Sequence, residues 1–180
     1  MRVNETARRA APKGNRHASI GGEISVELTA EYDALLCSRF CYQLGEEIGF
    51  TDRELWEISI VVSELVTNAL KFAGGGRMLV RLLPRPRPGI EIEVEDDGPG
   101  IADVDAALRD GYSEGRMLDE GETTYGRSGL GIGLGAVKRH TDELSIHSGA
   151  VGGTRVTARK WLHTGDGLRN IPRSSASNVR

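Results

Sequence analysis

The first part of the chain combines a strand-like and a helix-like pattern of apolar residues. Apolar and polar residues alternate over Ile20–Leu28, which predicts a strand with one buried face. Over Glu31–Ile48 the apolar residues instead recur every three or four positions, which predicts a helix that ends at Gly49. Cys37 and Cys41 lie on one face of this helix, where we interpret them as small apolar residues rather than as a metal or redox pair.

A second, longer helix follows. Thr51 and Glu54 have the spacing of a capping box, in which two side chains satisfy backbone amides at a helix start. Apolar residues from Leu55 to Phe72 then recur at steps of three and four, which predicts one buried face. Gly74 and the two glycines after it end the helix.

The rest of the body alternates short apolar segments with loops rich in glycine and aspartate. We expect strands at Met78–Leu83 and Ile90–Val94, a short helix at Val104–Arg109, a polar loop to Arg127, a helix at Leu130–His140, and strands at Leu144–His147 and Thr154–Trp161. This order of elements predicts an α+β sandwich with helices on one face of a sheet. We expect one domain over residues 20–162, with a disordered basic arm (1–19) before it and a disordered tail (163–180) after it.

Charge and hydropathy exclude several classes of function. Residues 1–22 carry five basic side chains and one acid, but the body of the domain is acidic, so we expect no direct nucleic-acid binding. No apolar run approaches the roughly 18–20 residues that a membrane helix needs, and the N-terminal residues lack the apolar core of a secretory signal. We therefore expect a cytoplasmic protein that does not bind membranes.

Three polar residues of the long helix share one of its faces. Glu64, Asn68 and Lys71 follow each other at steps of four and three. An amide oxygen suits a hard cation such as Mg²⁺, an ammonium suits phosphate, and a carboxylate can accept a proton. Taken alone, this set is more typical of an ordinary polar helix face.

Two glycine-containing segments and a final threonine add to this set. Asp96 ends a strand and opens a D-x-G-x-G segment with Gly98 and Gly100, where an aspartate could accept a hydrogen bond from an amine such as that of adenine. Further along, Gly129, Gly131 and Gly133 alternate with apolar residues just before a helix, an arrangement that can bind an anion through backbone N–H groups. Thr154 follows two glycines at the start of the last strand, where its hydroxyl could join the adenine hydrogen bonds. For each segment taken alone, a simple turn is the alternative.

The order of these segments resembles the N, G1, G2 and G3 boxes of the GHKL (Bergerat-fold) ATPases, which include gyrase, sensor histidine kinases and MutL. The chain is most similar to a small single-domain branch, the RsbT-type switch-protein serine/threonine kinases and anti-sigma factors. Segments that carry this similarity are Ser63–Asn68, Glu95–Ile101, Asp110–Ser113, Gly129–Gly135 and Lys160–Leu162. The resemblance implies a two-layer sandwich with a mixed, mostly antiparallel sheet and a flexible ATP lid. The segment Glu114–Arg127 is longer and more acidic than the corresponding link in the family.

The resemblance also implies a role for each candidate residue, with ATP and Mg²⁺ as the ligands. Asn68 would ligate Mg²⁺, Glu64 would be the base, and Lys71 would contact phosphate. Asp96 would bind the adenine amine and Thr154 would support it. The glycines would shape the pocket around the base (Gly98, Gly100) and wrap the phosphates (Gly129, Gly131, Gly133).

The function implied by this similarity is phosphorylation of a serine or threonine on a STAS-domain antagonist protein, with a phosphatase or sigma factor as a further partner. A non-catalytic anti-sigma module that only binds ATP is the main alternative. A histidine-kinase catalytic fragment fits less well, because none of the four histidines lies in a phosphoacceptor context. Since about 140 residues of ATP-binding domain leave no room for a substrate domain, we expect the substrate to be another protein.

Overall fold

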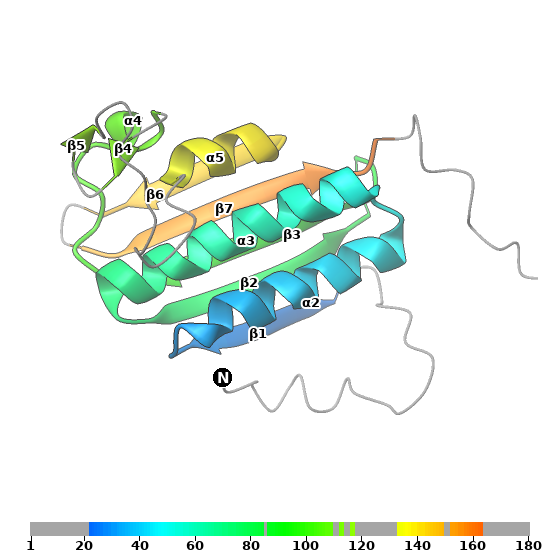
Figure 1. Cartoon of the computed structure of the whole chain (residues 1–180), viewed down its shortest axis with the longest axis horizontal. Helices are drawn as coiled ribbons and strands as arrows, with labels where there is room; N and C mark the ends of the chain where they lie inside the picture. The colour runs from blue at the N-terminus through cyan, green and yellow to red at the C-terminus, as the bar shows by residue number, and fades with distance from the viewer. Residues whose placement is uncertain are drawn as a thin grey trace, which may run out of the picture.

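A five-stranded sheet and a layer of helices make up the domain, shown in Figure 1. The computed structural model describes residues 22–84, 86–109, 112–113, 116–117, 133–149 and 152–163. The helices are α2 (Tyr32–Ile48), α3 (Asp52–Ala73), α4 (Val104–Ala107) and α5 (Gly133–His140). The strands are β1 (Glu23–Leu28), β2 (Gly76–Leu83), β3 (Gly89–Asp96), β4 (Tyr112–Ser113), β5 (Arg116–Met117), β6 (Glu143–Ser148) and β7 (Thr154–Trp161).

The strand order of the main sheet is β1-β2-β3-β7-β6. The last strand in sequence, β7, therefore lies between β3 and β6. Every neighbouring pair in this sheet is antiparallel. The expected α+β sandwich is confirmed. The sheet was expected to be mixed and mostly antiparallel, and all strand pairs among the described residues are antiparallel.

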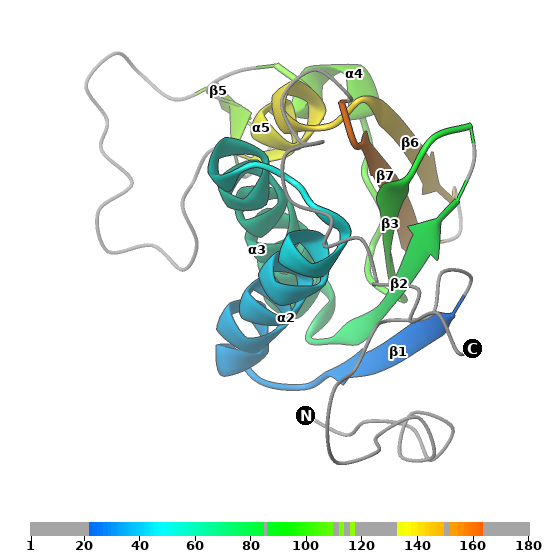
Figure 2. The same ribbon diagram turned by 90° about the vertical axis from the view of Figure 1, so that its right-hand side faces the viewer.

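The helices α2, α3 and α5 all cover the same face of the sheet, as the two views in Figures 1 and 2 agree. Thr51 begins α3 with the expected capping box: its Oγ1 accepts the Glu54 N–H at 3.4 Å, and Glu54 Oε2 accepts the Thr51 N–H at 2.9 Å. Gly74 ends the helix in the left-handed region, with φ of 73°. Local chemistry at these two positions therefore sets the length of the longest helix.

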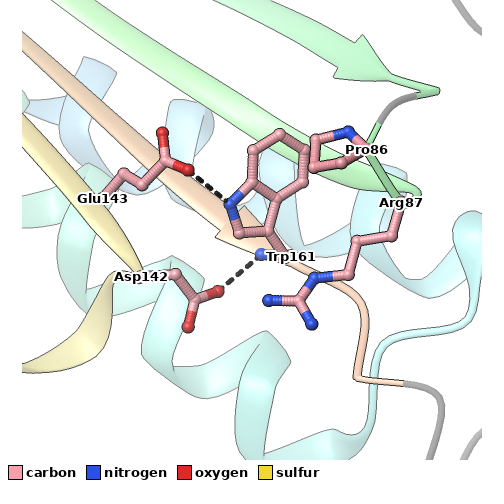
Figure 3. A pocket seen from close by; sticks show the side chains of 5 residues that line it. All are labelled: Pro86, Arg87, Asp142, Glu143 and Trp161. Atoms are coloured by element: carbon pink, nitrogen blue, oxygen red, sulfur yellow. Dashed lines mark hydrogen bonds between the residues drawn. The ribbon is translucent and has the colours of Figure 1, made fainter.

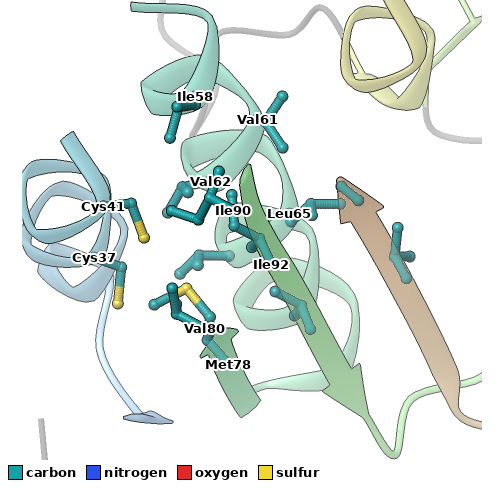
Figure 4. Packing of buried hydrophobic residues seen from close by; sticks show 14 of the residues in the cluster. Cys37, Cys41, Ile58, Val61, Val62, Leu65, Met78, Val80, Ile90 and Ile92 are labelled. Atoms are coloured by element: carbon teal, nitrogen blue, oxygen red, sulfur yellow. The ribbon is translucent and has the colours of Figure 1, made fainter. Parts of the chain in front are cut away.

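The core lies between the helices and the sheet. Cys37 and Cys41 are both fully buried in it, and Figure 4 shows their sulfurs pointing from α2 into the apolar cluster. Burial raises the pKa of the Cys37 thiol to about 12, and burial raises the pKa of Cys41 as well. Both thiols are therefore protonated and unreactive at neutral pH, as small apolar residues of a core would be.

The opposite face of the sheet is charged. Strand alternation sends Ile90, Ile92 and Val94 of β3 to the helices and the three glutamates between and after them to the open face. In register across all five strands of the sheet, one open-face row contains Glu23, Arg81, Glu91, Arg159 and Glu143. Consecutive members of this row form ion pairs, so these five side chains neutralise one another on the face that none of the described helices covers.

Several element boundaries differ from the sequence predictions. The short helix α4 ends at Ala107 rather than Arg109, and a small hairpin (β4 and β5) lies within the segment predicted to be loop. The helix expected to start at Leu130 is described from Gly133 onward, because residues 130–132 lie outside the described residues. His163, assigned to the tail from the sequence, contacts Glu54 Oε1 of α3 through Nδ1 at 3.2 Å. Residues 1–21 and 164–180 lie outside the described residues, so the predicted arm and tail remain predictions.

Among the helices that the structure describes, none has the length and apolar character to cross a bilayer.

Candidate nucleotide-binding site

The polar face of α3 runs from the core to the surface. Glu64 is buried, with 3% of its surface exposed, Asn68 is half-buried, and Lys71 is exposed. The Nζ atom of Lys71 lies 5.2 Å from the ring centroid of Phe72. The three predicted residues therefore share a face of α3 but lie at different depths, with the carboxylate deepest.

The side chain of Glu64 is hydrogen bonded to the backbone at the start of α5. The Gly133 N–H donates to Glu64 Oε2 at 3.2 Å, and the two residues are 69 positions apart in sequence. Gly133 has a φ of 64°, in the left-handed region that glycine adopts without strain. The structure thus brings the predicted base next to the last glycine of the predicted phosphate loop. Gly129 and Gly131 lie outside the described residues.

Asp96 ends β3 on the side of the sheet that faces the helices. Its Oδ1 accepts the Gly98 N–H at 2.9 Å. Burial raises the pKa of this carboxyl, and hydrogen bonds from the backbone N–H groups of Gly98 and Thr154 offset part of that rise. A carboxylate held in a half-buried position by backbone amides is a preorganised acceptor for an exocyclic amine.

The glycines of the D-x-G-x-G segment lie where a side chain does not fit. A Cβ on Gly98 would lie 2.7 Å from the Cβ of Ala73, at the end of α3. A Cβ on Gly100, whose φ is 80°, would lie 2.9 Å from Ser148 Oγ. The segment therefore packs between the end of α3 and the turn that joins β6 to β7. This packing brings the polar face of α3 and the D-x-G-x-G segment to one end of the domain.

Thr154 starts β7 directly beside Asp96, its partner in the β3–β7 register. The turn before it contacts the D-x-G-x-G segment through the backbone, because the Gly153 N–H donates to the Gly98 carbonyl at 2.6 Å. The structure thus brings together the predicted adenine residues Asp96, Gly98 and Thr154.

One polar residue at this place was not predicted from the sequence. Ser148, the last residue of β6, accepts the Ile101 N–H on its Oγ at 2.6 Å. The signal available in the sequence was a serine where the alternation of Leu144 and Ile146 predicts a third apolar residue.

These residues suit an adenine nucleotide with Mg²⁺. Asp96 provides the acceptor for an amine, and the two glycines of its segment let the backbone pack against Ala73 and Ser148, where a Cβ would clash. Asn68 offers a neutral oxygen of the type that Mg²⁺ accepts. The start of α5 adds N–H groups and the positive end of a helix dipole, which favour phosphate.

A separate hollow lies at the other end of the sheet. Its volume is about 390 Å³. Figure 3 shows the residues that line it, which are Pro86, Arg87, Asp142, Glu143 and Trp161. The backbone N–H of Trp161 donates to Asp142 Oδ2 at 2.6 Å, and its indole N–H donates to Glu143 Oε1 at 3.0 Å. Of the predicted nucleotide residues that the structure describes, none lines this hollow, and Trp161 lies at the opposite end of β7 from Thr154.

Comparison with known proteins decides the family. Residues 56–164 match the family model described as histidine kinase-, DNA gyrase B-, and HSP90-like ATPase. The chain belongs to this family. The match covers α3 from Trp56 onward, the D-x-G-x-G segment, α5 and β7, so it includes every candidate site residue named above.

Within this ATPase family, the chain is similar to a serine/threonine-protein kinase and to anti-sigma F factors. It is 35% identical over 138 residues to the serine/threonine-protein kinase RsbT of Bacillus subtilis, an alignment that covers 76% of this chain and 95% of RsbT. It is 33% identical over 115 residues to the anti-sigma F factor of Clostridium novyi, which covers 62% of this chain and 74% of that factor. These matches confirm the resemblance to RsbT-type kinases and anti-sigma factors.

A solved structure shows the same fold. The RsbU and RsbW domains of Rv1364c from Mycobacterium tuberculosis superpose with a TM-score of 0.50 at 18% identity. The superposition covers 77% of this chain, which spans about a third (32%) of that longer chain. It supports the sandwich fold described above.

Proposed function

We propose that this member of the ATPase family is a protein serine/threonine kinase of a partner-switching regulatory module, with a STAS-domain antagonist protein as its substrate. The observation that carries the proposal is the place of Glu64. It is a buried carboxylate, one helical turn from Asn68 and hydrogen bonded to the backbone at the start of α5. The similarity to RsbT over most of both chains supports the same reaction.

The chemistry needs a proton acceptor beside the phosphate site. A serine or threonine hydroxyl is a weak nucleophile, and a base within reach makes its oxygen more reactive. In the proposed reaction the hydroxyl oxygen forms a bond to the γ-phosphorus of ATP, the bond from that phosphorus to ADP breaks, and Glu64 accepts the hydroxyl proton. The Gly133 N–H fixes the orientation of the Glu64 carboxylate, and Mg²⁺ held by Asn68 supplies charge neutralisation when bound.

The sharpest test is the substitution Glu64→Gln. The amide side chain of this variant keeps an oxygen that can accept the Gly133 N–H but cannot take up the proton, so we expect phosphate transfer to fall about 100-fold or more while ATP still binds. The measurement is transfer of the γ-phosphate to purified STAS-domain proteins, with ATP affinity measured in parallel. Glu46→Gln, which changes an exposed glutamate of α2, is the control with the same change of charge.

The outcomes separate the two candidate functions. Undiminished transfer by Glu64→Gln would reject Glu64 as the base. The anti-sigma F factors among the relatives favour a second candidate, a module that binds ATP and a partner without transferring phosphate. Wild-type protein that binds ATP but phosphorylates none of the STAS-domain proteins would support this second function.

A further inference from the structure

Three polar residues form one row at the end of the sheet. Asp96 of β3 pairs with Thr154 of β7, and Thr154 pairs with Ser148 of β6. Directly opposite residues on neighbouring antiparallel strands have side chains on the same face, about 5 Å apart. The next row on this face toward the middle of the sheet contains Val94, Val156 and Ile146, so the polar row begins where the apolar face ends.

Ser148 belongs to the helix-facing side of this row. Alternation along β6 places it on the same face as Leu144 and Ile146, which pack against the core, and opposite to the exposed Ser145 and His147. A hydroxyl on this face is half-buried and needs a hydrogen-bond partner, because an unsatisfied polar group in a protein interior costs free energy.

The partner of Ser148 is the backbone of the D-x-G-x-G segment. Its Oγ accepts the Ile101 N–H at 2.6 Å and lies 3.5 Å from the carbonyl oxygen of Gly153, to which it donates. This side chain therefore joins the segment that follows Asp96 to the turn that precedes Thr154. Gly100 lies directly against it, with no room for a Cβ.

We infer that Ser148 is a positioning residue of the nucleotide site. It fixes the D-x-G-x-G segment against β6 and so holds the Asp96 carboxylate at the place where an adenine amine is recognised. The inference rests on the proposed ATP site. Ser148 acts through the backbone at Ile101 and needs no contact with the nucleotide.

The test compares ATP with purine riboside triphosphate, which lacks the amine on the base. Wild-type protein is expected to bind ATP about tenfold or more tightly than this analogue, because only ATP donates to Asp96. In Ser148→Ala the affinity for ATP should fall about five- to tenfold. The preference for ATP, which is the ratio of its affinity to that of the analogue, should fall toward one. A change in fold stability alone would weaken the binding of both nucleotides equally and leave the preference unchanged.

Two further variants complete the design. Ser148→Thr keeps the hydroxyl and should restore both the affinity and the preference for ATP. Ser145→Ala removes the other β6 hydroxyl, which contacts His147 Nε2 at 3.1 Å on the open face, and should behave as wild type. Ser148→Ala with wild-type preference, or Ser148→Thr with the defect of the alanine variant, would overturn the inference.

A measurement without nucleotide separates this inference from the proposed function. Amide hydrogen exchange of Ile101 should be faster in Ser148→Ala than in wild type and unchanged in Ser145→Ala. Unchanged Ile101 exchange in Ser148→Ala would reject the positioning role even if ATP binds as proposed. Wild-type protein that binds both nucleotides equally would instead reject the adenine site, and the role of Ser148 with it.

Discussion

At the scale of single residues, the site depends on side chains that are absent as much as on those that are present. Gly98 lets the D-x-G-x-G segment approach the end of α3, and Gly100 lets it approach Ser148. Asp96 then accepts backbone N–H groups at a cost, since burial raises its pKa and so opposes its charged form. A half-buried carboxylate with a raised pKa agrees with the proposed role of Asp96 in ligand recognition.

Asn68→Ala tests the predicted metal ligand. Removal of the amide oxygen should abolish most of the Mg²⁺-dependent part of ATP affinity, because alanine offers no ligand to the ion. Titration of ATP with Mg²⁺ and with a chelator separates that part from the rest. Gln43→Ala, which removes an exposed amide from α2, is the control and should leave both titrations unchanged. Equal affinity of Asn68→Ala and wild type in Mg²⁺ would argue against the whole site.

Gly100→Ala and Gly49→Ala form a matched pair. Both glycines have left-handed backbones, with φ of 80° and 96°, so alanine at either position should cost about 1–2 kcal/mol of folding free energy. Only at Gly100 would the new Cβ also meet Ser148 Oγ, whereas nothing lies within 4 Å of it at Gly49. Urea unfolding should therefore show a lower free energy of unfolding for both variants. ATP titration should show a lower affinity for Gly100→Ala alone. Weaker ATP binding by Gly49→Ala would mean that lost stability, not the local contact, sets affinity.

At the scale of elements, paired charges lie on the open face of the sheet, which no helix among the described residues covers. The Glu91 side chain, 7% exposed, lies between Arg81 at 2.7 Å and Arg159 at 2.6 Å. Burial alone would raise the pKa of Glu91, but the hydrogen bonds from the two arginines outweigh it and hold the pKa below the usual value of 4.5. Glu95 has a lowered pKa for the same reason, through Arg77 and Arg155. The central strand β3 thus has an apolar face that is buried in the core and an ionic face whose glutamates pair with arginines.

These lowered pKa values predict how stability depends on pH. A carboxyl whose pKa is lower in the folded chain binds its proton more weakly there, so its stabilisation is present above about pH 4.5 and is lost as the pH falls through the folded-state pKa. Urea unfolding at a series of pH values should show little change down to about pH 5 and a steep loss below it.

Glu91→Gln assigns part of this pH dependence to one residue. It should cost about 1–2 kcal/mol at neutral pH, because Arg81 and Arg159 each lose their most buried charged partner and keep only more exposed ones. The loss of stability below about pH 5 should also become smaller. Glu46→Gln, in which an exposed glutamate is replaced, is the control. A variant with the full wild-type pH dependence would show that other carboxyls account for it.

The same elements show what a sequence can and cannot predict. The start and end of α3 follow from local chemistry at Thr51 and Gly74, and the confirmed family resemblance follows from motifs that are each local. The row of Asp96, Thr154 and Ser148 depends instead on the register of three strands that are far apart in sequence. Nothing within the β6 segment alone indicates that Ser148 lies beside the D-x-G-x-G segment, so this residue could not be assigned before the sheet was known.

At the scale of the whole molecule, the proposed nucleotide site lies at one end of a helical hairpin. The short turn from Gly49 to Thr51 makes α2 and α3 antiparallel, so the start of α2 lies beside the later part of α3 (Figure 1). At 1.5 Å per residue, Leu35 and Asn68 are both roughly 20–24 Å from the turn, whereas Trp56 is only about 6 Å from it. Leu35 is 72% exposed and Trp56 is 65% exposed, so each end of the hairpin presents a large apolar side chain to solvent.

The exposed Leu35 at the Asn68 end of the hairpin is a candidate contact for a partner protein. We expect an acceptor that brings its hydroxyl to the site beside Asn68 to extend over the same end of the hairpin, where covering the exposed Leu35 would contribute binding free energy. Leu35→Ser should therefore slow phosphate transfer to the STAS-domain protein about tenfold while ATP affinity and thermal stability stay at wild-type values. Trp56→Ser is the matched control at the far end, where Trp56 contacts only Tyr42 among the described aromatic pairs, and should leave transfer unchanged. Equal slowing by both variants would place the acceptor elsewhere on the helical layer or make the effect one of stability, and unfolding measured for both variants would distinguish these outcomes.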